Sequence, residues 1–205
     1  MSEHSPHLGS RHGARQKERF DPARALKLDD LSRFDYLQPS DVLNLLDIPQ
    51  GGTVVDFGAG TGTYAIELAG RRPDAEVIAL DELPEMLVRL RSKPAAAQLK
   101  NLTPILADRI QELRNRADRV LALNVLHELG DRALEALRSL LKPEGAVLFI
   151  DWNAEVERPA GPPADEVYSP AEARERIAQA GFAVSLERKF PYHYAILARR
   201  CDPST

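Results

Sequence analysis

The chain has 205 residues, of which 43% are hydrophobic and 28% charged, and its formal net charge is −4. This size and composition favour one globular domain over a disordered chain, and so small a charge provides no global field for binding nucleic acid or an anionic membrane. No apolar run is long enough to span a membrane, the polar start does not resemble a signal peptide, and the single Cys201 excludes an internal disulfide, so we expect a cytoplasmic protein without membrane insertion.

The first 50 residues divide into a polar segment and two predicted helices. Residues 1–20 offer little to bury and are predicted to form a mobile tail, whose histidines lack the spacing of a closed metal site. Residues 11–27 carry an excess of basic side chains, which form either a solvated face or an arm that closes over an acidic or polar substrate. Helical spacing follows in residues 24–31, and a second helix starts at Ser40 and ends before Pro49.

A glycine-rich turn is the motif on which the rest of the chain depends. A β-branched run before it predicts a buried strand, and residues 63–69 after it place apolar side chains on one face of a helix that Gly70 is expected to end. Between the two, Gly58, Gly60 and Gly62 leave the backbone bare, so a ligand can lie against it. A strand, a glycine turn and a helix in this order predict a nucleotide-type binding site.

An acid beside this turn narrows the class of ligand. The spacing is Asp56-x-Gly58-x-Gly60-x-Gly62, and Thr63 departs from the G-x-G-x-x-G pattern of dinucleotide sites. A carboxylate two residues before the first glycine repels a pyrophosphate but suits a cationic ligand.

On these residues the chain resembles the class I S-adenosylmethionine-dependent methyltransferases, whose first motif is D/E-x-G-x-G-x-G after the first strand. The resemblance implies S-adenosylmethionine as the cofactor, which carries a sulfonium and an ammonium but no phosphate. It also implies that the helices of residues 21–50 cover the substrate as a lid.

The second predicted strand, residues 76–80, ends at Asp81. A carboxylate at this distance from the glycine turn is placed to accept hydrogen bonds from both ribose hydroxyls of the cofactor. Its alternative role is to cap the helix predicted over residues 85–90. Glu82 and Leu83 are assigned to the cofactor site with it, and either Leu83 or Met86 is expected to pack on the adenine.

The third predicted strand, residues 102–106, leads to Asp108 and Arg109, which we assign to the cofactor site. The resemblance implies that Asp108 accepts a hydrogen bond from the adenine amino group. Asp108 is equally suited to cap a short helix over residues 110–113.

The fourth predicted strand, residues 119–123, leads to Asn124 and His127. The carboxyl ends of parallel strands line the ligand site, so Asn124 is expected beside the methionine part of the cofactor and His127 near the transferred methyl group. The stretch around His127 resembles the Leu-His-Asp-x-x-Asp stretch of small-molecule O-methyltransferases, in which the histidine takes the proton of the acceptor hydroxyl. Glu128 or Asp131 would orient the ring of such a base; alternatively, His127 only lines the site or bonds the backbone.

Asp131 is then expected to cap a leucine-rich helix, and Lys142 to Gly145 form a turn typical of the family. The fifth predicted strand, residues 146–150, is followed by Trp152 and Asn153. Both are candidate substrate contacts, although Trp152 is equally suited to packing under a lid.

The last part of the chain completes the predicted fold. A proline-rich loop over residues 154–168 precedes a capping box at Ser169, and residues 182–189 and 192–199 are joined so tightly that they must pair antiparallel. The predicted fold is α/β, a doubly wound, mostly parallel seven-stranded sheet with a C-terminal antiparallel hairpin, in one domain over residues 21–205.

The predicted function is methyl transfer from S-adenosylmethionine to a hydroxyl or carbon of a small molecule, as in quinone-biosynthesis methyltransferases. The stretch after the fourth strand lacks the Asn/Asp-Pro-Pro-aromatic sequence of amino-methylating DNA enzymes, one cysteine cannot support arsenic methylation, and no basic stripe predicts nucleic-acid binding. No metal or covalent nucleophile is called for, and a homo-oligomer stays open. The alternatives are a protein that binds the cofactor without catalysis, as a sensor or assembly partner, and a nicotinamide-dependent (NAD(P)) oxidoreductase.

Overall fold

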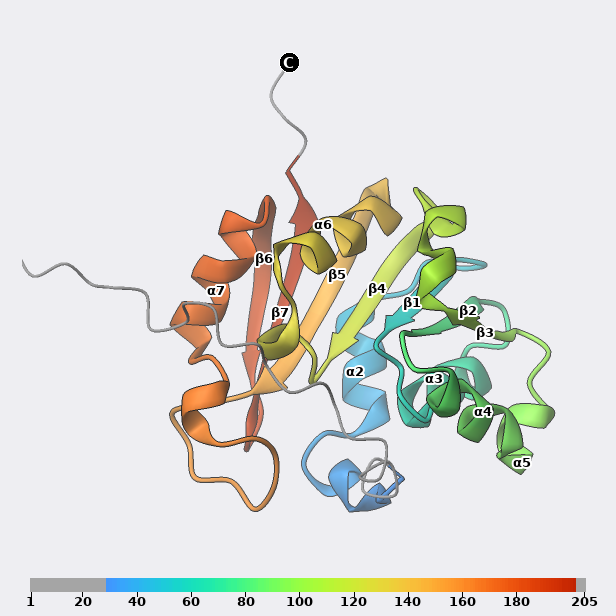
Figure 1. The fold of residues 1–205 in the computed structure, drawn as a ribbon, viewed down its shortest axis with the longest axis horizontal. Coiled ribbons are helices and arrows are strands. Elements are labelled where there is room, and N and C mark those ends of the chain that lie inside the picture. Colours follow the sequence, from blue (N-terminus) through green and yellow to red (C-terminus); the bar gives the residue numbers. More distant parts are fainter. Residues whose placement is uncertain (1–28, 202–205) are drawn as a thin grey trace, which may run out of the picture.

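The structure, a computed structural model, describes residues 29–201, and these fold around one seven-stranded sheet (Figure 1). The strands lie in the order β3-β2-β1-β4-β5-β7-β6. β1 to β5 pair in parallel, and β7 pairs antiparallel with both β5 and β6, which confirms the predicted fold class. Their bounds are β1 Thr53–Phe57, β2 Glu76–Asp81, β3 Leu102–Leu106, β4 Ala117–Leu123, β5 Leu141–Trp152, β6 Phe182–Lys189 and β7 His193–Arg200. The tail expected over residues 1–20 and most of the helix expected over 24–31 lie outside the described residues.

Helices cover both faces of this sheet (Figure 1). Side chains of α2 and α3 pack on one face, and side chains of η3, α6 and α7 pack on the other. The helical segments are η2 Leu31–Asp35, α2 Pro39–Leu46, α3 Thr63–Arg71, α4 Pro84–Ser92, α5 Pro94–Ala97, η3 Ala107–Leu113, η4 Leu126–Glu128, α6 Asp131–Leu140, η5 Ala164–Glu166 and α7 Pro170–Gln179. Between residues 29 and 201, no helix combines the length and apolar character that crossing a membrane requires.

The sheet is buried on both faces because neighbouring residues of its strands enter opposite cores. Val54 packs with α2 and α3, whereas Val55 packs with α6 and α7. Leu148 and Phe149 of β5 divide in the same way. This period of two explains why the central strands read as continuous apolar runs in the sequence.

Several local expectations differ from the structure. Gly70 does not end its helix, because α3 continues to Arg71. Asp131 is the first residue of α6 rather than its cap, since Gly130 occupies that position and no side chain caps the helix. Residues Lys142 to Gly145 form an irregularity within β5, not a turn before it, where the register against β4 shifts. A Cβ on Gly145 would lie 2.8 Å from the carbonyl oxygen of Ala117, so this close approach of two backbones requires glycine.

Candidate functional site

The glycine turn lies at the carboxyl end of β1 and has the backbone conformation that glycine favours. Gly58, Gly60 and Gly62 have φ angles of 74°, 55° and 76°. A Cβ on Gly58 would lie 2.7 Å from Cγ1 of Val125, and one on Gly62 would overlap the side chain of Leu90. The turn is therefore pressed between the end of β4 and α4, and its bare backbone is required by its neighbours as well as by its torsion angles.

Asp56 lies beneath this turn, almost fully buried, and its carboxyl group accepts a hydrogen bond from the backbone N–H of Ala65. Gly62 precedes α3 and has no side chain to cap it, so Asp56 satisfies an N–H group in the first turn of that helix. Burial, together with the nearby charge of Asp81, raises the pKa of Asp56 to about 7. A cationic ligand beside the turn would favour ionisation of both carboxyl groups.

Asp81 connects the glycine turn to the element that follows β2. Its Oδ2 accepts from the backbone N–H of Gly60 at 2.7 Å, and its Oδ1 accepts from that of Leu83 at 2.9 Å. Burial raises the pKa of this carboxyl group against the effect of those two hydrogen bonds. Each carboxylate oxygen keeps a second lone pair, so the predicted bonds to a ribose are compatible with the observed ones.

The remaining residues predicted to bind the adenosine part differ in their exposure. Glu82 is exposed and Leu83 half-buried, whereas Met86 is buried, so Leu83 has the surface that packing on an adenine needs. Asp108 is exposed in the first turn of η3 and is not its cap, which is Leu106. Arg109 is also exposed and pairs with Glu112 at 2.6 Å.

Asn124 follows β4 in a conformation that is unusual for a residue with a side chain. Its φ is 57°, its N–H donates to the carbonyl of Ile150 at 2.7 Å, and its Oδ1 is buried without a hydrogen-bond partner in the described part of the chain. A strained backbone and an unmatched acceptor beside the glycine turn fit a ligand that brings a donor. The ammonium of S-adenosylmethionine is such a donor.

His127 forms a buried pair with Asp151, which the sequence analysis did not single out. The His127 Nδ1 lies 2.9 Å from both carboxylate oxygens of Asp151, and the His127 backbone N–H donates to Oδ2 at 2.9 Å. Glu128 lies 3.5 Å from Nε2, as expected for an orienting acid, but Asp131 instead pairs with Arg176 at 2.6 Å. Asp151 was identifiable in principle, because it directly follows the predicted strand 146–150, and β5 lies next to the strand that leads to His127.

The charge of this pair follows from its surroundings. Burial lowers the pKa of His127, but the adjacent carboxylate of Asp151 and the contribution of Glu128 outweigh it and raise the pKa to about 9. At neutral pH the ring is therefore an imidazolium held between two acids. The ring becomes a proton acceptor as the pH rises towards and above its pKa of about 9.

Trp152 lies at the end of β5 in a group of aromatic rings. Its ring centroid is 4.0 Å from that of His193 and 6.2 Å from that of Tyr36, and neither partner was predicted from the sequence. Asn153, the other candidate substrate contact, is buried and uses its Oδ1 to accept from the N–H of Glu155. Asn153 therefore shapes the start of the proline-rich loop.

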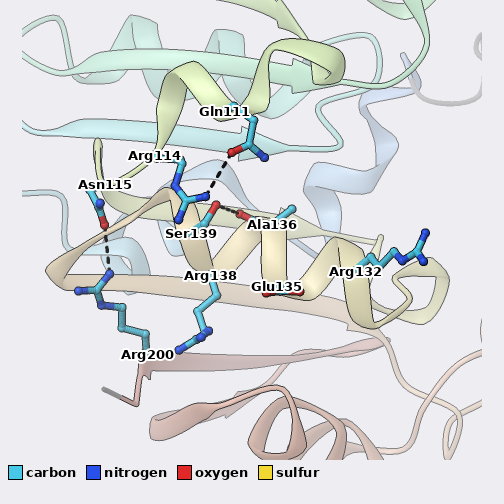
Figure 2. Close-up of a pocket in the computed structure, with 9 residues that line it drawn as sticks. All are labelled: Gln111, Arg114, Asn115, Arg132, Glu135, Ala136, Arg138, Ser139 and Arg200. Atoms are coloured by element: carbon cyan, nitrogen blue, oxygen red, sulfur yellow. Dashed lines mark hydrogen bonds between the residues drawn. The ribbon is translucent and has the colours of Figure 1, made fainter. Parts of the chain in front are cut away.

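A cavity of about 500 Å³ lies away from these residues, at the end of β7 and beside α6 (Figure 2). It is lined by Gln111, Arg114, Asn115, Arg132, Glu135, Ala136, Arg138, Ser139 and Arg200. Asn115 precedes β4, so this cavity opens at the opposite end of the strands from the glycine turn. It shares no residue with the predicted cofactor site.

Comparison with known proteins identifies the family. Residues 54–145 match the methyltransferase domain family. An S-adenosylmethionine-dependent methyltransferase from Aquifex aeolicus, known from a crystal structure, is 32% identical in sequence to this chain. The two structures superpose with a TM-score of 0.79, and the match covers 88% of this chain and 98% of the Aquifex chain. The chain belongs to the S-adenosylmethionine-dependent methyltransferases. S-adenosylmethionine is accordingly its cofactor, and the nicotinamide-dependent alternative is set aside.

Curated relatives of this methyltransferase match it over a shorter range. Trans-aconitate 2-methyltransferase of Methylobacterium radiotolerans is 39% identical over 108 residues, 51% of this chain and 39% of the relative. Release factor glutamine methyltransferase of Escherichia coli is 27% identical over 115 residues, 52% of this chain and 42% of the relative. The chain thus spans about two fifths of the length of these two relatives, so the match covers the common domain and not their whole length.

Proposed function

We propose that this protein transfers the methyl group of S-adenosylmethionine to a hydroxyl or carbon atom of a small molecule in the cytoplasm. The observation that carries this proposal is the buried pair of His127 and Asp151 at the ends of β4 and β5, next to the glycine turn. A relative whose name specifies a small molecule, trans-aconitate, supports the choice of acceptor.

The cofactor would be held by residues at the carboxyl ends of β1, β2 and β4. The glycine turn gives it bare backbone, Asp81 accepts from its ribose, and the Oδ1 of Asn124 accepts from its ammonium. Asp56 lies buried beneath the turn, and a cationic cofactor bound there would favour its ionised form. When bound, the cofactor supplies an electrophilic methyl group on a sulfonium.

His127 would take the proton of the acceptor. Asp151 fixes the ring by binding Nδ1, which leaves Nε2 as the atom that exchanges a proton. With a pKa of about 9, the neutral form of His127 is scarce at pH 7 and increases as the pH rises. An acceptor that ionises by itself would need only positioning against the methyl group.

The test is methyl transfer from cofactor labelled in the methyl group, with small-molecule extracts and protein fractions as separate acceptors. We expect label in small molecules and a rate that rises towards pH 9. The His127→Asn variant should lose turnover by about 100-fold or more while it binds the cofactor normally.

Two results would contradict the proposed methyl transfer to a small molecule, and a third would contradict only the role of His127. Label found only in protein would assign a macromolecular acceptor, in line with the name of the release factor relative. Cofactor binding without label in any product would favour a protein that binds without catalysis. Full activity of His127→Asn would leave methyl transfer in place and assign His127 to the structural role.

A further inference from the structure

Trp152 and four side chains near it lie on the face of the sheet opposite to Asp151, and we refer to the five residues as the Trp152 cluster: Arg33, Tyr36, Trp152, Arg158 and His193. Trp152 and His193 are direct neighbours across β5 and β7. Tyr36 stacks on His193, with centroids 5.8 Å apart and planes inclined by 12°, and its ring is also 6.2 Å from that of Trp152. The Arg158 guanidinium lies over the Trp152 ring at 5.7 Å. Three segments distant in sequence therefore meet at this cluster.

Four nitrogen atoms of the cluster are buried without hydrogen-bond partners in the described part of the chain. Within residues 29–201, nothing bonds Nε of Arg33, Nη1 of Arg158 or either ring nitrogen of His193. His193 itself is 1% exposed, so bulk water does not satisfy it. A buried donor without an acceptor costs free energy of folding, and such groups are rare in native proteins. Three such donors in one cluster, on Arg33, Arg158 and His193, indicate that a bound molecule provides the missing acceptors.

The cluster also has uncompensated positive charge. Within the described residues, neither Arg33 nor Arg158 forms an ion pair with a carboxylate, and the Arg158 side chain donates a hydrogen bond to the carbonyl of Pro162 at 2.7 Å. Burial, together with the charges of both guanidinium groups and against the charge of Asp151, lowers the pKa of His193 to about 3. His193 is therefore neutral and offers one N–H donor and one acceptor.

We propose that the Trp152 cluster binds a carboxylate group of the methyl acceptor, with Arg33, Arg158 and His193 donating to its oxygens. This inference rests on the proposed function and specifies its substrate class, a small organic acid. Guanidinium groups suit carboxylates because their N–H donors match the spacing of the two oxygens. A phosphate, with more charge and more oxygens, would leave acceptors unmatched among three donors.

The position of the cluster is suited to an acceptor. Trp152 follows Asp151 directly, so a molecule held at the cluster lies at the same end of β5 as the His127–Asp151 pair. Both guanidinium side chains are only partly buried, which leaves them reachable from the surface. Tyr36 additionally lines a hollow of about 380 Å³ that extends to the turn between β6 and β7. The methyl acceptor can therefore reach the cluster from the protein surface, where Arg33, Arg158 and the hollow beside Tyr36 are accessible.

The test uses the fluorescence of Trp152, which is the only tryptophan in the chain and thus reports on the cluster alone. The full chain, without cofactor, is titrated with acetate, fumarate, benzoate and 4-hydroxybenzoate, and in parallel with the neutral amide of each acid. We expect a saturable change in emission with at least one carboxylate. Its amide should require a concentration about 10-fold higher or more, because it lacks the charge.

Variants identify the donors. Arg33→Gln and Arg158→Gln should each weaken carboxylate binding by about 10-fold or more, and Arg158→Lys should restore part of it. Arg174→Gln is the matched control, since it removes an exposed arginine that pairs with Glu187 on α7 and β6, and it should bind like the unmodified protein. Circular dichroism of each variant verifies that the fold is retained.

The inference is overturned if no carboxylate changes the emission of Trp152, if acids and amides bind equally, or if Arg33→Gln and Arg158→Gln bind like Arg174→Gln. These results are separate from the fate of the proposed function, because the titration requires no turnover. Methyl transfer to neutral acceptors alone would sustain the proposed function and reject the carboxylate site. Carboxylate binding without any methyl transfer would sustain the carboxylate site and reject the proposed function.

Discussion

Asp81 has one observed role and one predicted role, which measurements of cofactor affinity and of stability can tell apart. It holds the backbone N–H groups of Gly60 and Leu83, and the prediction from sequence adds the two hydroxyls of a ribose. We expect Asp81→Ala to weaken S-adenosylmethionine binding by about 1–3 kcal/mol, through lost charged hydrogen bonds and a looser glycine turn. Isothermal titration calorimetry measures this directly.

The control for Asp81 is Glu85→Ala, which removes an exposed acid from the first turn of α4 without touching the glycine turn. Its affinity for the cofactor should be that of the unmodified protein. If Asp81→Ala also binds normally while its thermal stability falls, the carboxylate only ties the turn to α4 and the ribose contact is wrong.

The His127–Asp151 pair predicts how stability depends on pH. His127 has a pKa of about 9 when folded and about 6.5 when unfolded, so the folded state binds this proton more tightly. The contribution is complete below pH 6.5 and is lost as the pH rises through 9, and its size is on the order of 3 kcal/mol. Urea unfolding from pH 6 to pH 10 should show this loss.

His127→Gln provides the comparison, because glutamine does not titrate. The difference in unfolding free energy between the two proteins should shrink as the pH increases from 6.5 to 9. A difference that stays constant over this range would mean that His127 is not protonated in the folded state, in conflict with its position between Asp151 and Glu128.

At the scale of elements, the sequence predicted what depends on local pattern. Hydrophobic runs located all seven strands within a few residues, and the tight link before His193 required an antiparallel pair. The capping box at Ser169 is present in full. Each of these features is determined by residues that are close together in the chain.

What the sequence could not predict depends on residues from separate elements. Asp151 pairs with His127 across β4 and β5, and Tyr36 stacks on His193 although 157 positions separate them in the sequence. Asp131 has the right spacing to orient His127, but α6 carries it towards Arg176. Such partners are set by how helices and strands pack, which no local motif records.

Gly62 tests the link between the glycine turn and α4. An alanine there has a left-handed φ, which costs about 1–2 kcal/mol, and its Cβ also overlaps Leu90, which adds about 1–3 kcal/mol. Gly51→Ala is the matched control, because Gly51 has a φ of 67° but nothing within 4 Å of its Cβ. We expect chemical denaturation to show a clearly larger loss for Gly62→Ala, and equal losses would disprove the packing contribution.

At the scale of the whole molecule, the carboxyl end of β5 contributes a side chain to each of the two proposed sites, one on either face of the sheet. Asp151 and Trp152 are consecutive, so their side chains point to opposite sides. One side holds the titrating pair with His127, and the other holds the Trp152 cluster with its unmatched donors. The two proposals for this protein, a base and a carboxylate site, are thus positioned by the same two residues of β5.

The proline-rich loop contacts the Trp152 cluster at Arg158, and Gly161 of the same loop lies close to the Trp152 ring. Gly161 has a φ of 96°, and a Cβ there would lie 2.8 Å from Cε2 of Trp152. Gly161→Ala should therefore lift the loop, carry Arg158 away from the ring, and expose Trp152 to quenching by acrylamide. Carboxylate binding should weaken in the same variant, because Arg158 is one of the proposed donors. Gly130→Ala, with open space around its Cβ, should leave quenching unchanged; equal quenching in both variants would show that the loop does not depend on this contact.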